Sequence, residues 1–261
     1  MIVKKYKECL SRNSPDKLQN VNLVMLTNKD GKYGVRPLSL MNPCLYYFII
    51  RSITDKDNWR LIKKHFKLCT SDHINLCAMP IIPAEIESFP KSTTILNWWN
   101  NYEQQTIELS FHYSLMFITD ITNCYGSVLL TDIKKALCRK NTAYESNDLE
   151  PLSEELITYI KAMQGGSIVG IPQGSVVFDF ISEMIMSYSD LLLKEELDRR
   201  DIKDYKILRY RDDFRIFSNN HSELRTISYC LQHILESLNF RMNVKKTKIP
   251  DDLVLGGIKE D

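Results

Sequence analysis

The sequence predicts an α+β fold in which an antiparallel sheet carries helices on one face. Apolar residues at two-residue spacing in residues 208–217 indicate a strand that turns back into a second strand. Apolar residues at three- and four-residue spacing in residues 177–192 indicate an amphipathic helix. The predicted order near the centre and end of the chain is strand, helix, helix, hairpin, helix and strand, which is typical of this class.

The amino-acid composition limits the classes of protein to which this chain can belong. The chain has 261 residues, of which 44% are apolar and 26% charged, which favours a soluble globular protein of one large or two small domains. Collagen-like, coiled-coil and disordered classes are excluded. The net charge is only +1, so attraction to nucleic acid would depend on local basic patches such as residues 56–67 and 241–248. Each patch could equally be a solvated face.

The cysteine pattern and the absence of targeting signals favour a cytoplasmic protein. Seven cysteines are scattered without a CxxC pair, which fits reduced thiols better than a disulfide framework. No signal peptide is apparent, and no apolar run approaches the ~20 residues of a membrane helix. Four potential zinc ligands occur every fourth residue, but on one helix they would fan apart instead of converging; these are His65, Cys69, His73 and Cys77.

The N-terminal part predicts a hairpin followed by helices. Residues 21–26 and 33–38 are expected to be strands, with Lys32 and Arg36 on the hairpin. These cations could hold a triphosphate, or the hairpin could be an ordinary exposed one. Residues 45–62 and the segment from Ser92 to Gln105 have helical character, and prolines mark residues 80–90 as a loop.

A buried strand is expected to deliver Asp120 to the edge of the sheet. The apolar run of residues 115–118 ends just before this aspartate. Tyr125 follows five residues later and would place a flat phenol beside whatever the acid binds. Thr131 is expected to cap a short helix.

A loop at a helix N-terminus forms the next candidate site. Pro151 is expected to open a helix that Gly165 stops. Residues 170–175, which include Gln173 and Gly174, then precede the amphipathic helix. Free backbone N–H groups at such a terminus favour an anion or a polar base edge.

The hairpin at residues 208–217 carries Asp212 and Asp213 at its tip. Paired carboxylates suit a hard cation such as Mg²⁺, although Asp is also a common residue of solvated turns. A third acid, Asp120, on a neighbouring strand favours the metal interpretation. The chain then predicts a helix over residues 224–238 and a strand over residues 240–244, with Asn243, Lys246 and Thr247 at its end.

Taken together, these motifs resemble those of the reverse transcriptase family. Residues 117–121 with Tyr125 resemble its first catalytic motif, residues 170–175 its second, residues 210–213 its third, and Asn243 with Lys246 and Thr247 its fourth. Residues 36–38 resemble its fingers motif. The match covers about residues 30–250. The amino-acid sequences of the motifs are most similar to those of bacterial defence-associated and abortive-infection members, which are relatives of retron and group II intron enzymes.

The resemblance implies a right-hand polymerase with fingers and palm, in which the palm is RRM- or ferredoxin-like. Residues 1–113 would form fingers, 114–140 the palm segment with the first motif, 141–169 a return to the fingers, and 170–261 the rest of the palm. The chain ends after the fourth motif, so we expect no thumb and either a minimal form or a fragment. Arg211 departs from the family, which usually has a small or apolar residue there.

The implied activity is RNA-directed DNA synthesis by two-metal phosphoryl transfer, in antiphage defence. Two Mg²⁺ ions, or Mn²⁺, would be held by Asp120 and Asp212, with Asp213 assisting and the Ile121 carbonyl as a backbone ligand. Lys246 would protonate pyrophosphate. The nucleotide contacts would be Arg36, Lys32, Tyr125, Gln173, Gly174 and Ile121.

The expected partners are an RNA template, a DNA product and deoxynucleoside triphosphates. A non-coding RNA, a partner protein or a second copy of the chain could also bind. No membrane partner is expected. Tyr125 would exclude a 2′-hydroxyl and so favour DNA as the product. The alternatives are an RNA-directed RNA polymerase of the same palm class and a catalytically idle scaffold that binds nucleic acid.

Overall fold

The computed structural model describes residues 22–28, 34–78, 91–138 and 148–257, with only the backbone of residues 91–100. The chain divides into two compact units. The first comprises residues 1–68 and 123–188, and the second comprises residues 69–122 and 189–261. Each unit is therefore built from two separate parts of the sequence.

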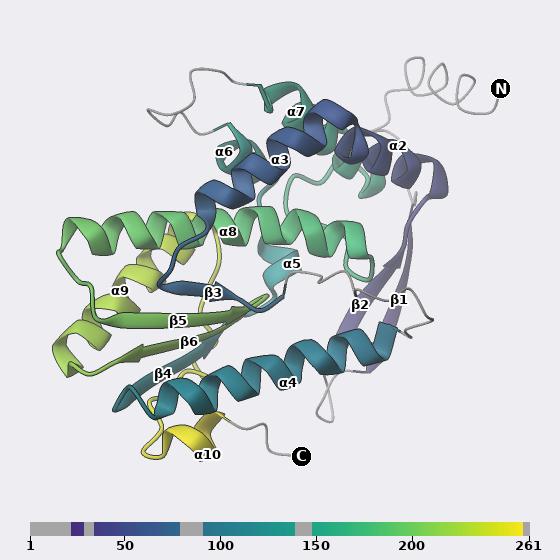
Figure 1. The fold of residues 1–261 in the computed structure, drawn as a ribbon. Helices are drawn as coiled ribbons and strands as arrows, with labels where there is room; N and C mark the ends of the chain where they lie inside the picture. The colour runs from purple at the N-terminus through teal and green to yellow at the C-terminus, as the bar shows by residue number, and fades with distance from the viewer. Residues whose placement is uncertain (1–21, 29–33, 79–90, 139–147, 258–261) are drawn as a thin grey trace. The chain divides into compact units, whose positions relative to one another are not determined.

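The first unit combines a hairpin with helices (Figure 1). Strands β1 (Leu23–Asn28) and β2 (Val35–Leu40) pair antiparallel. The helices that follow are α2 (Pro43–Thr54), α3 (Lys56–Cys69), α5 (Cys124–Ser127), α6 (Leu130–Leu137), α7 (Glu150–Met163) and the first half of α8 (Val176–Arg199).

Local sequence signals explain where these helices begin. The Asn42 side chain accepts hydrogen bonds from the backbone N–H groups of Cys44 and Leu45, and Pro43 occupies the first turn of α2. Pro151 occupies the first turn of α7, as predicted. Helix α6 begins at Leu130, so the prediction that Thr131 caps it is wrong: Thr131 lies inside the first turn.

The second unit is built on a four-stranded sheet with the order β3-β5-β6-β4. Its strands are β3 (Ile74–Leu76), β4 (Leu115–Asp120), β5 (Tyr205–Tyr210) and β6 (Asp213–Ser218). Strand β6 pairs antiparallel with β5 and β4, whereas β3 pairs parallel with β5. The helices of this unit are α4 (Lys91–Ser110), the second half of α8, α9 (His221–Ser237) and α10 (Leu253–Gly257).

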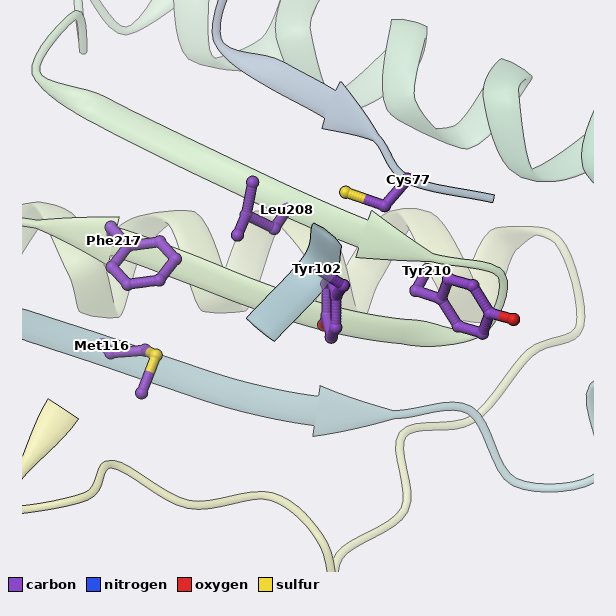
Figure 2. Packing of buried hydrophobic residues seen from close by; sticks show 6 residues of the cluster. All are labelled: Cys77, Tyr102, Met116, Leu208, Tyr210 and Phe217. Atoms are coloured by element: carbon purple, nitrogen blue, oxygen red, sulfur yellow. The ribbon is translucent and has the colours of Figure 1, made fainter. Parts of the chain in front are cut away.

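Apolar side chains cover both faces of this sheet. On one face, Tyr102 from α4 packs into a buried cluster with Cys77, which follows β3, and with residues of β4, β5 and β6 (Figure 2), namely Met116, Leu208, Tyr210 and Phe217. On the other face, Ile207, Phe214 and Ile216 are also buried, and Figure 1 shows α9 on the side of the sheet opposite α4. Burial on both faces explains the continuous apolar run of residues 115–118 in β4.

The predicted α+β class, a sheet carrying helices, is confirmed, with two additions. The edge strand β3 is parallel to its neighbour, and α4 covers the second face of the sheet. The prediction of a strand over residues 240–244 is wrong. This segment makes only an isolated bridge, between Met242 and Ile121, because the chain turns at Asn243, whose carbonyl accepts from the Lys246 and Thr247 N–H groups.

Two predictions concern residues outside those described. The proline-rich loop falls on residues 79–90, and Lys32 lies within residues 29–33. No helix in the described ranges is both long enough and apolar enough to pass through a lipid bilayer.

Candidate active site

Three carboxylates gather at one end of the second unit's sheet. The register places Asp120 of β4 directly opposite Asp213 of β6, and side chains in such cross-strand pairs have Cβ atoms about 5 Å apart. Asp212 lies in the adjoining turn, and its carbonyl accepts a hydrogen bond of 3.2 Å from the Ile121 N–H. Residues more than ninety positions apart in the chain therefore meet at this edge.

The turn that presents Asp212 and Asp213 has an unusual backbone. Arg211 adopts φ 56°, in the left-handed region that non-glycine residues seldom occupy. Its carbonyl accepts a 2.9 Å hydrogen bond from Nη1 of Arg209. A buried arginine thus holds the turn from beneath.

Asp190 on α8 fixes that arginine. Nε of Arg209 lies 3.1 Å and 2.9 Å from the two carboxylate oxygens of Asp190, and Nη2 lies 2.7 Å from Oδ2. The side chains are 0% and 5% exposed. This forked geometry is the strong form of an arginine–carboxylate pair, and it leaves Nη1 to contact the turn.

Burial and neighbouring negative charges raise the pKa values of Asp212 and Asp213. Burial raises the pKa of Asp213 to about 7, and the charges of Asp212 and Asp120 add to this effect, while Lys246 and Arg215 oppose it. The pKa of Asp212 is also raised, first by burial and then by Asp120. A positive charge placed among the acids would relieve this repulsion.

Lys246 is one such charge. Its ammonium group forms an ion pair with Oδ2 of Asp120, and the Asn243 N–H donates to the Asp120 carbonyl at 2.7 Å. Burial lowers the pKa of Lys246, but its hydrogen bond and charge interactions with Asp120, together with the charges of Asp213 and Asp212, raise it overall. Lys246 therefore stays protonated beside the acids.

The donor chemistry fits a divalent cation, because carboxylate oxygens are the ligands that Mg²⁺ prefers. In the described part of the chain, however, no three His, Cys, Asp or Glu side chains are grouped so as to hold a metal ion. The four residues of the zinc alternative also lie in the described part of the chain. Its two histidines face backbone carbonyls instead, His65 that of Met184 and His73 that of Tyr205.

The first unit contains a pocket of about 480 Å³ that brings together two predicted nucleotide contacts, Tyr125 and Gln173. Its size is within the usual range for a small-molecule site. The lining comes from the hairpin, the α5 region, the end of α7 and the loop before α8, with the residues Asn22, Val24, Pro37, Ser39, Asn123, Tyr125, Gly126, Met163, Gln164, Gly165, Gly170, Ile171, Pro172 and Gln173.

Backbone hydrogen bonds join the walls of this pocket. The Ile171 N–H donates to the Tyr125 carbonyl at 2.9 Å, and the Gly170 N–H donates to the Val128 carbonyl at 2.7 Å. Gly170 has φ +85°, and a Cβ there would lie 3.5 Å from the Gly126 carbonyl oxygen. The loop before α8 is thus held against the segment that carries Tyr125.

The other predicted contacts lie nearby or at the surface. The Ser39 N–H donates to the Gln173 carbonyl at 2.8 Å, which ties the hairpin to the loop. Gly174 has φ +114° and lies against Leu38. Arg36 is exposed on β2, and its carbonyl accepts from the Thr27 hydroxyl.

Sequence reasoning missed several residues at these two places. Asn123 and Gln164 line the pocket, and the Gln164 side-chain amide donates to the Gly170 carbonyl at 2.8 Å. The preference of Asn for left-handed backbone could have indicated Asn123, which has φ 50°. Asp190 and Arg209 gave no local signal, because their contact joins a helix to a strand.

One protein-family model matches more than half of the chain. The family model described as "Reverse transcriptase (RNA-dependent DNA polymerase)" matches residues 52–252. No curated protein sequence matches the chain.

Two similar solved structures are Candida telomerases in complex with a TWJ fragment of telomeric RNA. The Candida albicans enzyme is 13% identical, with a TM-score of 0.51, and the match covers 95% of this chain and 47% of that one. The Candida tropicalis enzyme is 14% identical, with a TM-score of 0.52 and coverages of 88% and 40%. This chain therefore spans less than half the length of either structure.

Proposed function

Because the chain belongs to the reverse transcriptase family, we propose that it extends a primer end with deoxynucleotides copied from an RNA template. The observation that carries this proposal is the pairing of Asp120 with Asp213 at the sheet edge, beside Asp212. A structural sheet has no need for three crowded carboxylates, since their mutual repulsion costs free energy.

Asp120 and Asp212 are the proposed metal ligands, with Asp213 and the Ile121 carbonyl in support. Two bound Mg²⁺ ions would activate the primer hydroxyl and stabilise the leaving pyrophosphate. The raised pKa values of Asp212 and Asp213 support this assignment, because such acids gain from a nearby cation. Mn²⁺ has similar ligand preferences.

Lys246 is proposed to act twice at this site. Its ion pair with Asp120 neutralises one acid while no metal is bound. Its ammonium group is also the proposed proton donor to the leaving pyrophosphate.

The pocket of the first unit is proposed to hold the sugar and base of the incoming nucleotide. Tyr125 and Gln173 line it, and Tyr125 follows Asp120 by only five residues in the sequence. Gly174 would allow close backbone approach, while Arg36 and Lys32 would bind the triphosphate. A tyrosine ring under the sugar leaves no room for a 2′-hydroxyl, so the product would be DNA.

An RNA partner is supported by charge on α3. Five cations recur along one exposed side of this helix, at the spacing that keeps side chains together, namely Lys56, Arg60, Lys63, Lys64 and Lys67. The RNA bound to the telomerases named above agrees with such a partner. We further propose the fingers and palm division described from the sequence.

The proposed biological role rests on the amino-acid sequences of two motifs. Residues 120–127 and 208–217 are most like bacterial defence-associated reverse transcriptases, so we propose an antiphage role in the cytoplasm, with a non-coding RNA or a partner protein as additional components.

One other function has an observation in its favour. A palm that binds nucleic acid without polymerising would need no metal, and Lys246 already pairs with Asp120. An RNA polymerase is less well supported, because Tyr125 would obstruct a ribose.

A primer-extension assay separates these functions. It would use an RNA template, Mg²⁺, and deoxy- or ribonucleotides in parallel. We expect extension with deoxynucleotides by the wild type, none by Asp120→Asn, and wild-type activity by Asp198→Asn, which removes an exposed acid from α8. Extension by Asp120→Asn at the wild-type rate would refute the metal assignment, and extension only with ribonucleotides would favour the RNA polymerase.

A further inference from the structure

We propose that Asp179 is a positioning residue that sets the preference for deoxy- over ribonucleotides by holding the Tyr125 ring. This inference rests on the proposed function, in which Tyr125 lies beneath the nucleotide sugar. The two residues are 54 positions apart, and Asp179 itself is not among the residues that line the pocket. It would act through the tyrosine.

The contact is short and involves a charged acceptor. The Tyr125 hydroxyl donates to Oδ1 of Asp179 at 2.5 Å, which is in the range of O–H···O⁻ bonds and stronger than a bond between neutral groups. Asp179 lies in the first turn of α8, where its own N–H donates to the Ser175 carbonyl at 3.0 Å. The positive end of the helix dipole favours a carboxylate at this place.

The backbone beneath the tyrosine is already held. The Ile171 N–H donates to the Tyr125 carbonyl. The adjoining Gly126 is packed so closely that a Cβ there would lie 2.3 Å from Nδ2 of Asn123. The Tyr125 side chain can rotate about two torsions, and the hydroxyl contact with Asp179 restrains that rotation.

A ring restrained at its hydroxyl resists displacement better than the same ring without that contact. Steric exclusion of a 2′-hydroxyl requires this resistance, because a side chain that can tilt away accommodates the extra oxygen. Loss of the Asp179 contact should therefore lower the KM for ribonucleotides while the kcat for deoxynucleotides is retained. We expect selectivity to fall about tenfold, since a hydrogen bond to a charged group contributes on that scale.

Single-nucleotide incorporation tests the inference. The variants are Asp179→Ala, Asp179→Asn, Tyr125→Phe and the double variant Asp179→Ala with Tyr125→Phe. Asp179→Ala and Tyr125→Phe should lose the same selectivity, and the double variant should lose no more than either. Asp179→Asn retains an oxygen acceptor and should recover most of the selectivity. Asp198→Asn is the matched control, because it removes an acid from the same helix without touching the pocket.

A separate measurement keeps a folding defect from being misread. Urea denaturation midpoints of the same variants form a double-mutant cycle, and non-additive shifts would support the Tyr125–Asp179 contact. Additive shifts, or full selectivity in Asp179→Ala when Tyr125→Phe loses it, would overturn the inference. If the wild type incorporates no nucleotide, the proposed function fails, whereas incorporation with unchanged selectivity refutes only the role of Asp179.

Discussion

Removing Asp190 should destabilise the protein strongly, because it would leave the Arg209 guanidinium buried without its carboxylate. The Arg209 side chain is 0% exposed and that of Asp190 5%, so water cannot take over the lost contacts. Breaking such a pair by truncating one partner costs about 3–5 kcal/mol. Against a total stability of about 5–15 kcal/mol for a typical protein, Asp190→Ala should lose a large fraction of its folding free energy.

The double variant Asp190→Leu with Arg209→Met separates stability from positioning. Apolar residues of similar volume can replace a buried pair at little cost in stability, so we expect most of the loss to be recovered. The variant still lacks the Nη1 contact to the Arg211 carbonyl. The Asp212 turn should then lose its support, and DNA synthesis should stay low in a well-folded protein.

Urea denaturation followed by circular dichroism measures the first effect, and primer extension measures the second. A loss below about 1 kcal/mol for Asp190→Ala, the usual size for an exposed pair, would refute the buried-pair argument. Normal synthesis by the double variant would refute the claim that Arg209 holds the turn.

Three further outcomes are expected. Asp212→Ala combined with Asp213→Ala should abolish DNA synthesis. The variant should not unfold, since both acids have raised pKa values and repel each other. Primer extension and thermal melting measure the two effects, and retained synthesis would refute the metal assignment. Lys63→Glu with Lys67→Glu should weaken RNA binding, as measured by fluorescence anisotropy. The slope of the logarithm of the binding constant against the logarithm of salt concentration should become smaller by about one unit per lost phosphate contact. An unchanged slope would contradict a role for α3. Burial lowers the pKa of His65, although its hydrogen bond to a backbone carbonyl opposes this, so the unfolded chain binds a proton at a higher pH than the folded chain does. The stability of the wild type should therefore fall below about pH 6.5. His65→Gln should show a smaller drop in urea midpoint between pH 7 and pH 5.5, and equal drops would contradict burial of the imidazole.

Much of the fold could be predicted because its signals are local. Two-residue apolar spacing located β5 and β6, and helical spacing located α8 and α9. The failures were also local in origin. Residues 240–244 include residue types that are common in strands, but a strand forms only where successive residues pair with a neighbouring strand. The turn at Asn243 ends the pairing after the single bridge between Met242 and Ile121.

By itself, the sequence indicated the residues to which we assign the proposed chemistry: Asp120 follows an apolar strand, Asp212 and Asp213 occupy a hairpin tip, and Tyr125 follows the first acid. Spacing and turn chemistry are properties of neighbouring residues, so they can be interpreted without a fold. Only the tertiary structure decided what holds those residues in place. Arg209 reaches Asp190 from a strand to a helix, and Tyr125 reaches Asp179 across 54 positions, because such contacts arise from the packing of whole elements.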